Sequence, residues 1–172
     1  MRPLLLLAAT AMALALPAPA LAQEVFAGVY AHGVKTRLSL DADREGGADL
    51  SLGLRGKPIA GTPLQPYALA SVNLDGGTNF LVGGLSVRVG DRLYVRPGLG
   101  LAVHDGSASN FQLPDRLAFG SRVLFAPELA VGTQLNERIG IEASWLHFSH
   151  AQLFGKQNPG VDNIGVRLNV RL

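Results

Sequence analysis

Apolar and polar positions alternate with a period of two along most of the chain after residue 22. The clearest stretch is 93–103, where one face holds mainly apolar side chains and the other holds polar or small ones. The apolar face consists of Leu93, Val95, Pro97, Leu99, Leu101 and Val103. Such alternation is typical of β-strands, and the stretches 81–89 and 163–172 repeat it. Because Gly or Pro interrupts almost every candidate helix, the pattern predicts an all-β protein.

Eight strands are predicted. They span 24–34, 46–54, 64–73, 79–89, 92–104, 119–133, 138–149 and 162–172. Most are long enough to cross a bilayer with tilt, which takes ~9 to 11 residues. Tight connections at 90–91 and 136–137 alternate with long ones at 35–45, 105–118 and 150–161. Transmembrane barrels join their strands in this way, so we predict an eight-stranded antiparallel up-and-down transmembrane β-barrel.

A soluble β-sandwich is the alternative fold, because it also produces strands with one apolar face. Two features count against a membrane barrel. Aromatic residues make up only 6% of the chain, and Pro66, Pro97 and Pro127 fall inside predicted strands, where a missing N–H weakens the ladder. The even strand number and the need to close the sheet in a membrane favour the barrel.

Residues 1–22 have the features of a secretory signal peptide. Arg2 supplies a positive start, the segment 4–16 is apolar, and Ala20-Leu21-Ala22 fits a small-residue cleavage site. We expect cleavage before Gln23, which leaves residues 23–172 as the barrel. Export of such a barrel indicates a multi-pass protein of the outer membrane of a Gram-negative bacterium.

Composition excludes several kinds of function. The 172 residues fit a single domain, and the absence of Cys excludes disulfides, thiolate metal sites and Cys nucleophiles. A net charge of +2 without a basic cluster gives little support to nucleic-acid binding. His147 and His150 would lie on opposite faces of a strand, so we expect no metal site and no other cofactor. Seven charged residues fall on inward faces and are expected to form a network in the barrel. They are Arg88, Arg96, Arg122, Glu128, Glu142, Arg167 and Arg171.

The candidate chemistry lies in the strand 138–149. A period of two places His147 and Ser149 on the same face as the apolar residues Ile141, Ala143 and Trp145. Unpartnered polar groups against hydrocarbon cost several kcal/mol, so partners or a function are expected.

Asp162 is a suitable partner, because it falls in the same alternating series as the apolar residues of the last strand. Adjacent antiparallel strands can bring Ser149, His147 and Asp162 together on the outer surface. This is the arrangement of a nucleophile, a base and an orienting acid. Asn158, in the intervening loop, can offer an amide N–H to a developing oxyanion.

The segments 147–151 (His-Phe-Ser-His-Ala) and 158–162 (Asn-Pro-Gly-Val-Asp) resemble the C-terminal signature of the outer-membrane lipid A 3-O-deacylases, the PagL family. That pattern reads His, aromatic, Ser, Asn, Ala and, after a short loop, Asn, any residue, Gly, any residue and an acid. Weaker similarity upstream extends the resemblance over about the last third of the chain. This sequence has His150 in place of Asn, Asp162 in place of the commoner Glu, and a loop one residue longer.

The resemblance implies a serine esterase that hydrolyses the 3-position acyl ester of lipid A in the outer leaflet. His147 would be the general base, Ser149 the nucleophile and Asp162 the acid. Asn158, Ala151 and Gly160 match the pattern at positions expected to contact the oxyanion or substrate. The resemblance implies an eight-stranded barrel with lipid A or lipopolysaccharide as its partner, no cofactor, and a possible homodimer.

Two other functions fit the residues. The chain can be a non-catalytic small barrel with a structural or adhesive role, whose long loops bind a partner. It can also be an esterase directed at phospholipids. Lipid A and phospholipid profiles, with and without the protein, distinguish these functions.

Overall fold

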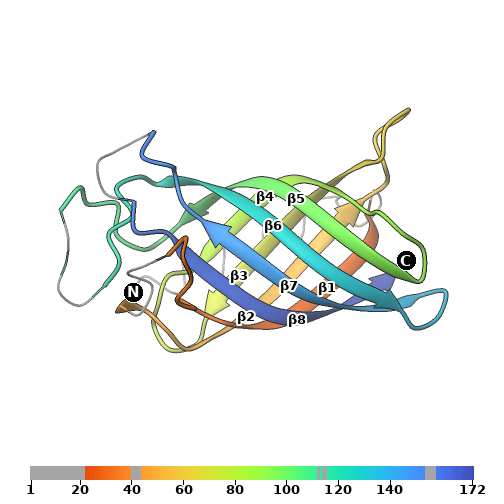
Figure 1. The fold of residues 1–172 in the computed structure, drawn as a ribbon, viewed down its shortest axis with the longest axis horizontal. Helices are drawn as coiled ribbons and strands as arrows, with labels where there is room; N and C mark the ends of the chain where they lie inside the picture. Colours follow the sequence, from red (N-terminus) through yellow and green to blue (C-terminus); the bar gives the residue numbers. More distant parts are fainter. Residues whose placement is uncertain (1–21, 40–43, 112, 114–115, 154–157) are drawn as a thin grey trace.

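The computed structural model describes residues 22–39, 44–111, 113, 116–153 and 158–172, which form a closed antiparallel β-barrel. Its eight strands are β1 (Ala22–Ala31), β2 (Ala48–Gly56), β3 (Leu64–Asn73), β4 (Phe80–Val87), β5 (Leu93–His104), β6 (Val123–Gln134), β7 (Ile139–Phe148) and β8 (Val161–Arg171). Each strand pairs with the next one in the chain, and β1 pairs with β8 to close the sheet (Figure 1). The predicted fold is therefore confirmed, and the two-layered sandwich is excluded.

The period of two separates the outside of the barrel from its interior. Outward-facing apolar side chains such as Leu99 and Val166, each 59% exposed, lie on a surface rich in Leu, Ile and Val. A transmembrane barrel requires such an apolar outer face. No helix among the described residues is long and apolar enough to cross a membrane.

The interior is filled by side chains. A cluster of stacked aromatic rings lies in the half near the long loops, where the ring centroids of Phe80 and Phe148 are 4.0 Å apart. Ion pairs occupy the other half and involve Glu24, Arg55, Arg96, Glu128, Glu142 and Arg167. Four members of this network were predicted. Arg122 and Arg171 were expected there too, but both side chains are exposed, and Arg122 donates to the carbonyls of His104 and Gly106. Arg88 lies at the edge of the network, where its guanidinium stacks on Tyr94.

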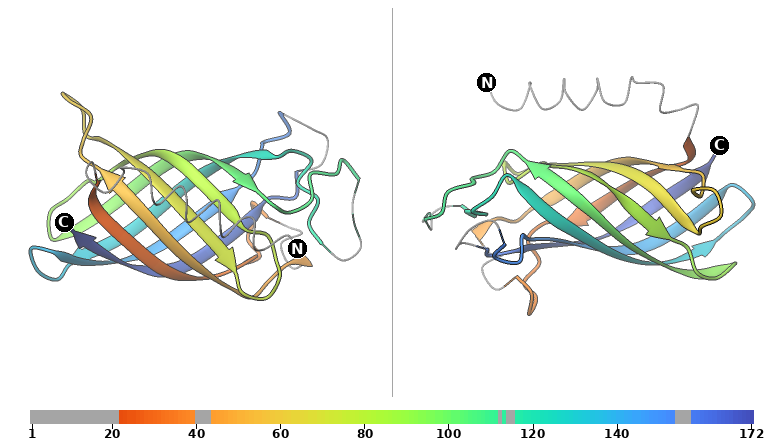
Figure 2. Two further views of the ribbon diagram at one scale, coloured as in Figure 1. Left: turned by 180° about the vertical axis from the view of Figure 1, so that it is seen from behind. Right: turned by 90° about the horizontal axis from the view of Figure 1, so that it is seen from above.

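The connections alternate between the two ends of the barrel as expected (Figures 1 and 2). One end carries the links 57–63, 88–92 and 135–138. The other end carries the links 32–47, 74–79, 105–122 and 149–160, three of which are long. We refer to this second end as the loop end, and to residues 32–47 as loop 1.

Most predicted strand boundaries differ from the structure by at most two residues, and two differ by more. The first strand ends at Ala31 and not at residue 34, because Gly33 has a left-handed φ of 65° that turns the chain out of the ladder. The sixth begins at Val123 and not at residue 119, since residues 117–119 fold into the mouth of the barrel. Leu117 and Phe119 are buried there, and Phe119 contacts the ring of His104. The predicted signal peptide lies outside the described residues except for Ala22, where β1 begins.

Candidate active site

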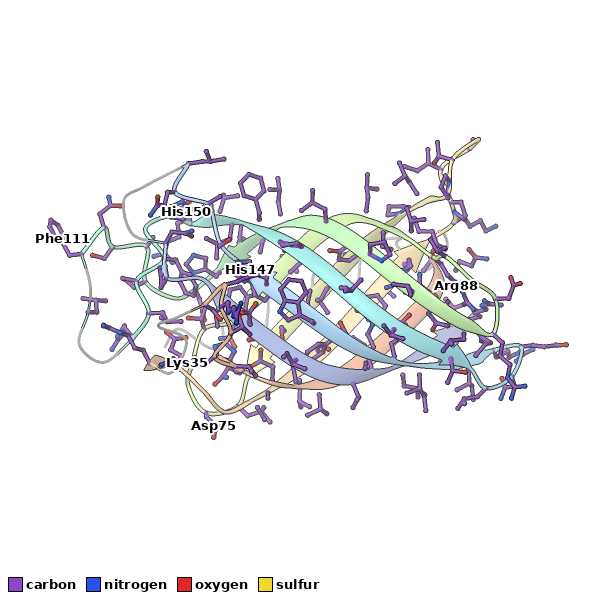
Figure 3. The ribbon with its side chains drawn as sticks, in the orientation of Figure 1. Lys35, Asp75, Arg88, Phe111, His147 and His150 are labelled. Carbon is purple, nitrogen blue, oxygen red and sulfur yellow. The ribbon has the colours of Figure 1, made fainter. Side chains whose placement is uncertain are left out.

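The register between β7 and β8 places His147 directly opposite Asp162. Both residues belong to the outer face, since their neighbours two positions away are Trp145 and Ile164 and the alternate residues Leu146 and Asn163 are buried inside. His147 lies near the end of β7, toward the loop end of the barrel, and Arg88 lies toward the opposite end (Figure 3). Sequence alternation therefore predicted the correct face for both side chains.

Ser149, His147 and Asp162 form a continuous hydrogen-bonded chain. His147 Nδ1 lies 2.8 Å from Asp162 Oδ1, and His147 Nε2 lies 2.9 Å from Ser149 Oγ. When the carboxylate accepts the Nδ1 proton, Nε2 is left as an acceptor for the serine hydroxyl. The structure thus brings together the three predicted residues in the geometry of an activated nucleophile, its base and an orienting acid.

Asp162 is fully buried although it lies on the outer wall of the barrel. Its Oδ1 also accepts a hydrogen bond from the indole Nε1 of Trp145 at 2.8 Å. Its Oδ2 accepts hydrogen bonds from the hydroxyls of Ser39, at 2.5 Å, and Thr36. A buried carboxylate needs such donors to stay ionised, because hydrogen bonds to the charged form compensate for lost hydration.

The nucleophile is held by backbone pairing beyond the end of β7. Ser149 and Phe125 exchange both backbone hydrogen bonds, at 2.7 and 3.1 Å. The preceding residue, Phe148, is fully buried and anchors the strand end by stacking on Phe80 of the opposite wall. The segment that carries His147 and Ser149 is therefore fixed by ring stacking inside the barrel and by backbone pairing with Phe125 of β6.

The loop 149–160 places Asn158 next to the site. The backbone N–H of His150 donates to Asn158 Oδ1 at 2.8 Å, which orients the amide and leaves its Nδ2 as the donor. The strand pattern predicted that His150 lies on the opposite face of the strand from His147. In the structure His150 lies beyond the end of β7 and is buried. Ala151 is exposed and has a left-handed φ of 51°.

Gly160 lies against the catalytic candidates. It has a left-handed φ of 67°, and a Cβ at this position would be 3.0 Å from His147 Cε1 and 2.9 Å from the carbonyl oxygen of Leu38. The residue was predicted to contact the oxyanion or substrate. In the structure it packs against the imidazole ring.

Three neighbours of Asp162 were not identified from the sequence as site residues. Trp145 was assigned only to the lipid-facing surface, and Thr36 and Ser39 lie in a loop more than a hundred residues away in sequence. The predicted closure of the barrel could have indicated the position of this loop. Pairing of β1 with β8 brings the loop after β1 beside the start of β8, where Asp162 lies. Nothing in the loop sequence indicated which hydroxyls would reach the carboxylate.

Metal chemistry has no candidate in the described part of the chain. Within these residues, no group of three or more His, Cys, Asp and Glu side chains is arranged to hold a metal ion.

Comparisons with known proteins agree with the barrel fold. No curated protein matches the sequence significantly. The crystal structure of the outer membrane enzyme PagL matches with a TM-score of 0.62 and 20% sequence identity, covering 87% of this chain and 99% of that chain. A de novo designed transmembrane β-barrel matches with a TM-score of 0.50 and 13% identity, over 87% of this chain and 96% of that one. At these identities the matches show a shared fold.

The family assignment comes from the sequence itself. The profile of the family described as lipid A 3-O-deacylase (PagL) matches residues 62–171, which is more than half of the chain and includes His147, Ser149, Asn158 and Asp162. The chain therefore belongs to the lipid A 3-O-deacylase (PagL) family.

Proposed function

We propose that this protein is a serine esterase of the outer membrane that hydrolyses the 3-position acyl ester of lipid A. Family membership gives the reaction class. The observation that carries the proposal is the Ser149–His147–Asp162 chain on the outer wall of the barrel. A lipid substrate reaches an outer wall by lateral diffusion in the leaflet, whereas the barrel interior is filled by aromatic and charged side chains.

The reaction begins when Ser149 Oγ attacks the ester carbonyl carbon. His147 Nε2 accepts the hydroxyl proton, and Asp162 holds the resulting imidazolium through Nδ1. Collapse of the tetrahedral intermediate breaks the bond to the sugar oxygen, which takes the proton from His147. Water then attacks the acyl-enzyme, with His147 acting again as the base, and releases a free fatty acid.

The oxyanion of the tetrahedral intermediate needs a donor near Ser149. Asn158 meets this need best. The His150 N–H donates to Asn158 Oδ1 at 2.8 Å, and this bond fixes the orientation of the amide group and of its Nδ2 donor. A fixed donor stabilises the developing charge without reorganisation during the reaction. We assign the left-handed residue Ala151 to the substrate-facing turn next to it.

The direct test replaces the nucleophile and compares lipid A by mass spectrometry in cells that express each variant. Ser149→Ala should abolish the loss of one acyl chain and leave the barrel folded, as judged by heat-modifiable gel migration. Ser144→Ala is the matched control, since Ser144 lies on β7, the strand that leads to Ser149, and is buried inside the barrel. Continued deacylation by Ser149→Ala would exclude this mechanism.

Phospholipid profiles from the same cells separate the two substrate classes. Deacylation of lipid A with unchanged phospholipids supports the proposal, and the reverse result supports the phospholipid esterase. Unchanged lipids of both classes in cells with the folded wild-type protein indicate a non-catalytic barrel. Membrane fractionation tests the outer-membrane location, and cross-linking tests the homodimer.

A further inference from the structure

Loop 1 supplies two hydroxyl groups to the carboxylate of Asp162. Ser39 Oγ donates to Oδ2 at 2.5 Å, and Thr36 Oγ1 donates to the same oxygen. The other oxygen, Oδ1, faces His147 and Trp145. The two carboxylate oxygens therefore have separate tasks, one toward the imidazole and one toward the loop.

This division matters because an aspartate carboxylate rotates easily about its last side-chain bond. Terminal torsions of this type have broad, roughly two-fold energy wells. Donors on both oxygens fix the rotation and keep Oδ1 in line with His147 Nδ1. Ser39 and Asp162 are both fully buried, so water does not replace a missing hydroxyl without a change in packing.

The loop itself is attached to β8 around the same residue. The Val34 N–H donates to the carbonyl oxygen of Asp162 at 2.8 Å, and the Gly33 N–H donates to Asn163 Oδ1 at 3.2 Å. Within the loop, the Leu38 N–H donates to Thr36 Oγ1 at 3.0 Å. These bonds hold the two hydroxyls at a fixed place relative to the carboxylate.

We propose that Thr36 and Ser39 are positioning residues of the active site, which orient the Asp162 carboxylate toward His147. The proposal rests on the proposed esterase function. It extends the site from the β7–β8 hairpin to the loop that follows β1, so that the catalytic arrangement depends on closure of the barrel. Both residues act through Asp162, to which their hydroxyls donate.

The test compares Thr36→Val/Ser39→Ala with wild type and with the hydroxyl-retaining variant Thr36→Ser/Ser39→Thr. A misplaced catalytic group costs up to about a hundredfold in rate, so kcat should fall by about tenfold to a hundredfold in Thr36→Val/Ser39→Ala. KM should stay within about twofold of wild type, because substrate contacts are unchanged. The hydroxyl-retaining variant should keep most of the wild-type kcat. Ser109→Ala, which removes a loop hydroxyl bonded to the Phe111 N–H, is the matched control.

A spectroscopic measurement tests the position of the carboxylate without substrate. The chain has one Trp, so a single indole N–H resonance reports the hydrogen bond from Trp145 to Asp162 Oδ1. This resonance should shift in Thr36→Val/Ser39→Ala and stay in place in Ser109→Ala. Labelling of Ser149 by a fluorophosphonate, which requires an activated serine but no lipid A, should slow in parallel.

The outcomes separate the two proposals. Wild-type protein that neither deacylates lipid A nor reacts with the fluorophosphonate overturns the esterase function, while the indole resonance still tests the positioning role. A folded Thr36→Val/Ser39→Ala protein with wild-type kcat, or with an unshifted indole resonance, overturns the positioning role. If that variant fails to assemble, Ser39→Ala and Thr36→Val are measured singly against the same two readouts.

Discussion

At the residue scale, the candidate site is a group of hydrogen-bonded polar side chains on the otherwise apolar outer face of the barrel. His147 and Asp162 are 7% and 0% exposed, although they alternate with residues that face the bilayer. Loop 1 and the ring of Trp145 provide the cover, and the donors on Asp162 compensate for its burial. A short acid is sufficient here, because the strand register places it opposite the imidazole.

Gly160 provides a prediction at this scale. Gly160→Ala should lower deacylation by about tenfold or more, because the new Cβ would lie 2.9 Å from the Leu38 carbonyl oxygen and 3.0 Å from His147 Cε1 and a misplaced base costs rate. The left-handed φ of 67° adds backbone strain of roughly 1 to 2 kcal/mol. The measurement is the initial rate of deacylation on purified lipid A.

Gly83→Ala is the control for this substitution. Gly83 lies on the outer face of β4, and a Cβ there meets nothing within 4 Å. Its rate should equal that of wild type. A wild-type rate for Gly160→Ala would show that the imidazole tolerates displacement and that close packing is unimportant.

At the element scale, the loops are joined by a buried ionic cluster. His32 Nδ1 contacts both carboxylate oxygens of Asp49 at 3.0 and 3.1 Å, and its Nε2 lies 3.5 Å from Glu45 Oε2. Glu45 in turn accepts hydrogen bonds from the N–H groups of Thr78 and Leu117. A single acid in loop 1 therefore connects three of the four links at the loop end.

This cluster makes loop stability depend on pH. Burial disfavours a charge on His32, but hydrogen bonds and Coulombic attraction from Asp49 and Glu45 outweigh it and raise the pKa of His32 to about 9 from 6.5. A raised pKa means that the stabilisation is complete below pH 6.5 and is lost as the pH rises to about 9. The loss amounts to about 3 kcal/mol. Burial opposes ionisation of Glu45 too, but His32 and Thr78 lower its pKa, so Glu45 stays charged throughout this window.

Urea unfolding of the detergent-solubilised protein, followed by the fluorescence of Trp145, tests this prediction. The difference in unfolding free energy between wild type and His32→Gln should be largest near pH 6 and should shrink by about 3 kcal/mol as the pH approaches about 9.5. A difference that is constant over this range would show that folding does not raise the pKa of His32.

The elements themselves were largely predictable, and their ends were less so. Alternation identified 64–73 as a strand with its correct bounds, and it placed His147, Ser149 and Asp162 on one face because a strand has an invariant period of two. The sixth strand was predicted to begin at residue 119, but Phe119 turns into the barrel mouth, where its contacts with His104 and Phe80 decide its course. Thr36 and Ser39 could not be assigned, since their partner is set by the path of a loop without periodicity.

At the scale of the whole molecule, the barrel closes around a charged interior. Arg167 is 2% exposed and pairs with Glu128 and Glu142, and Arg96 pairs with Glu142 from the other side. These pairs join β8 to β6 and β7, and β5 to β7, while Arg96 also pairs with Glu24 of β1 across the lumen. They fix β7 and β8, which carry the candidate site, against β5 and β6.

Replacement of Arg167 should reveal how far the barrel depends on this network. Arg167→Leu leaves Glu128 buried without its cation, and breaking a buried pair costs about 3 to 5 kcal/mol. The double variant Arg167→Leu/Glu128→Leu should recover much of this loss, because apolar replacement of both partners is often neutral. Arg88→Leu, at the partly exposed edge of the network, should cost about 1 kcal/mol or less. Urea unfolding gives all three values, and equal stability of Arg167→Leu and Arg88→Leu would mean that lumen packing, and not the ion pairs, holds the walls together.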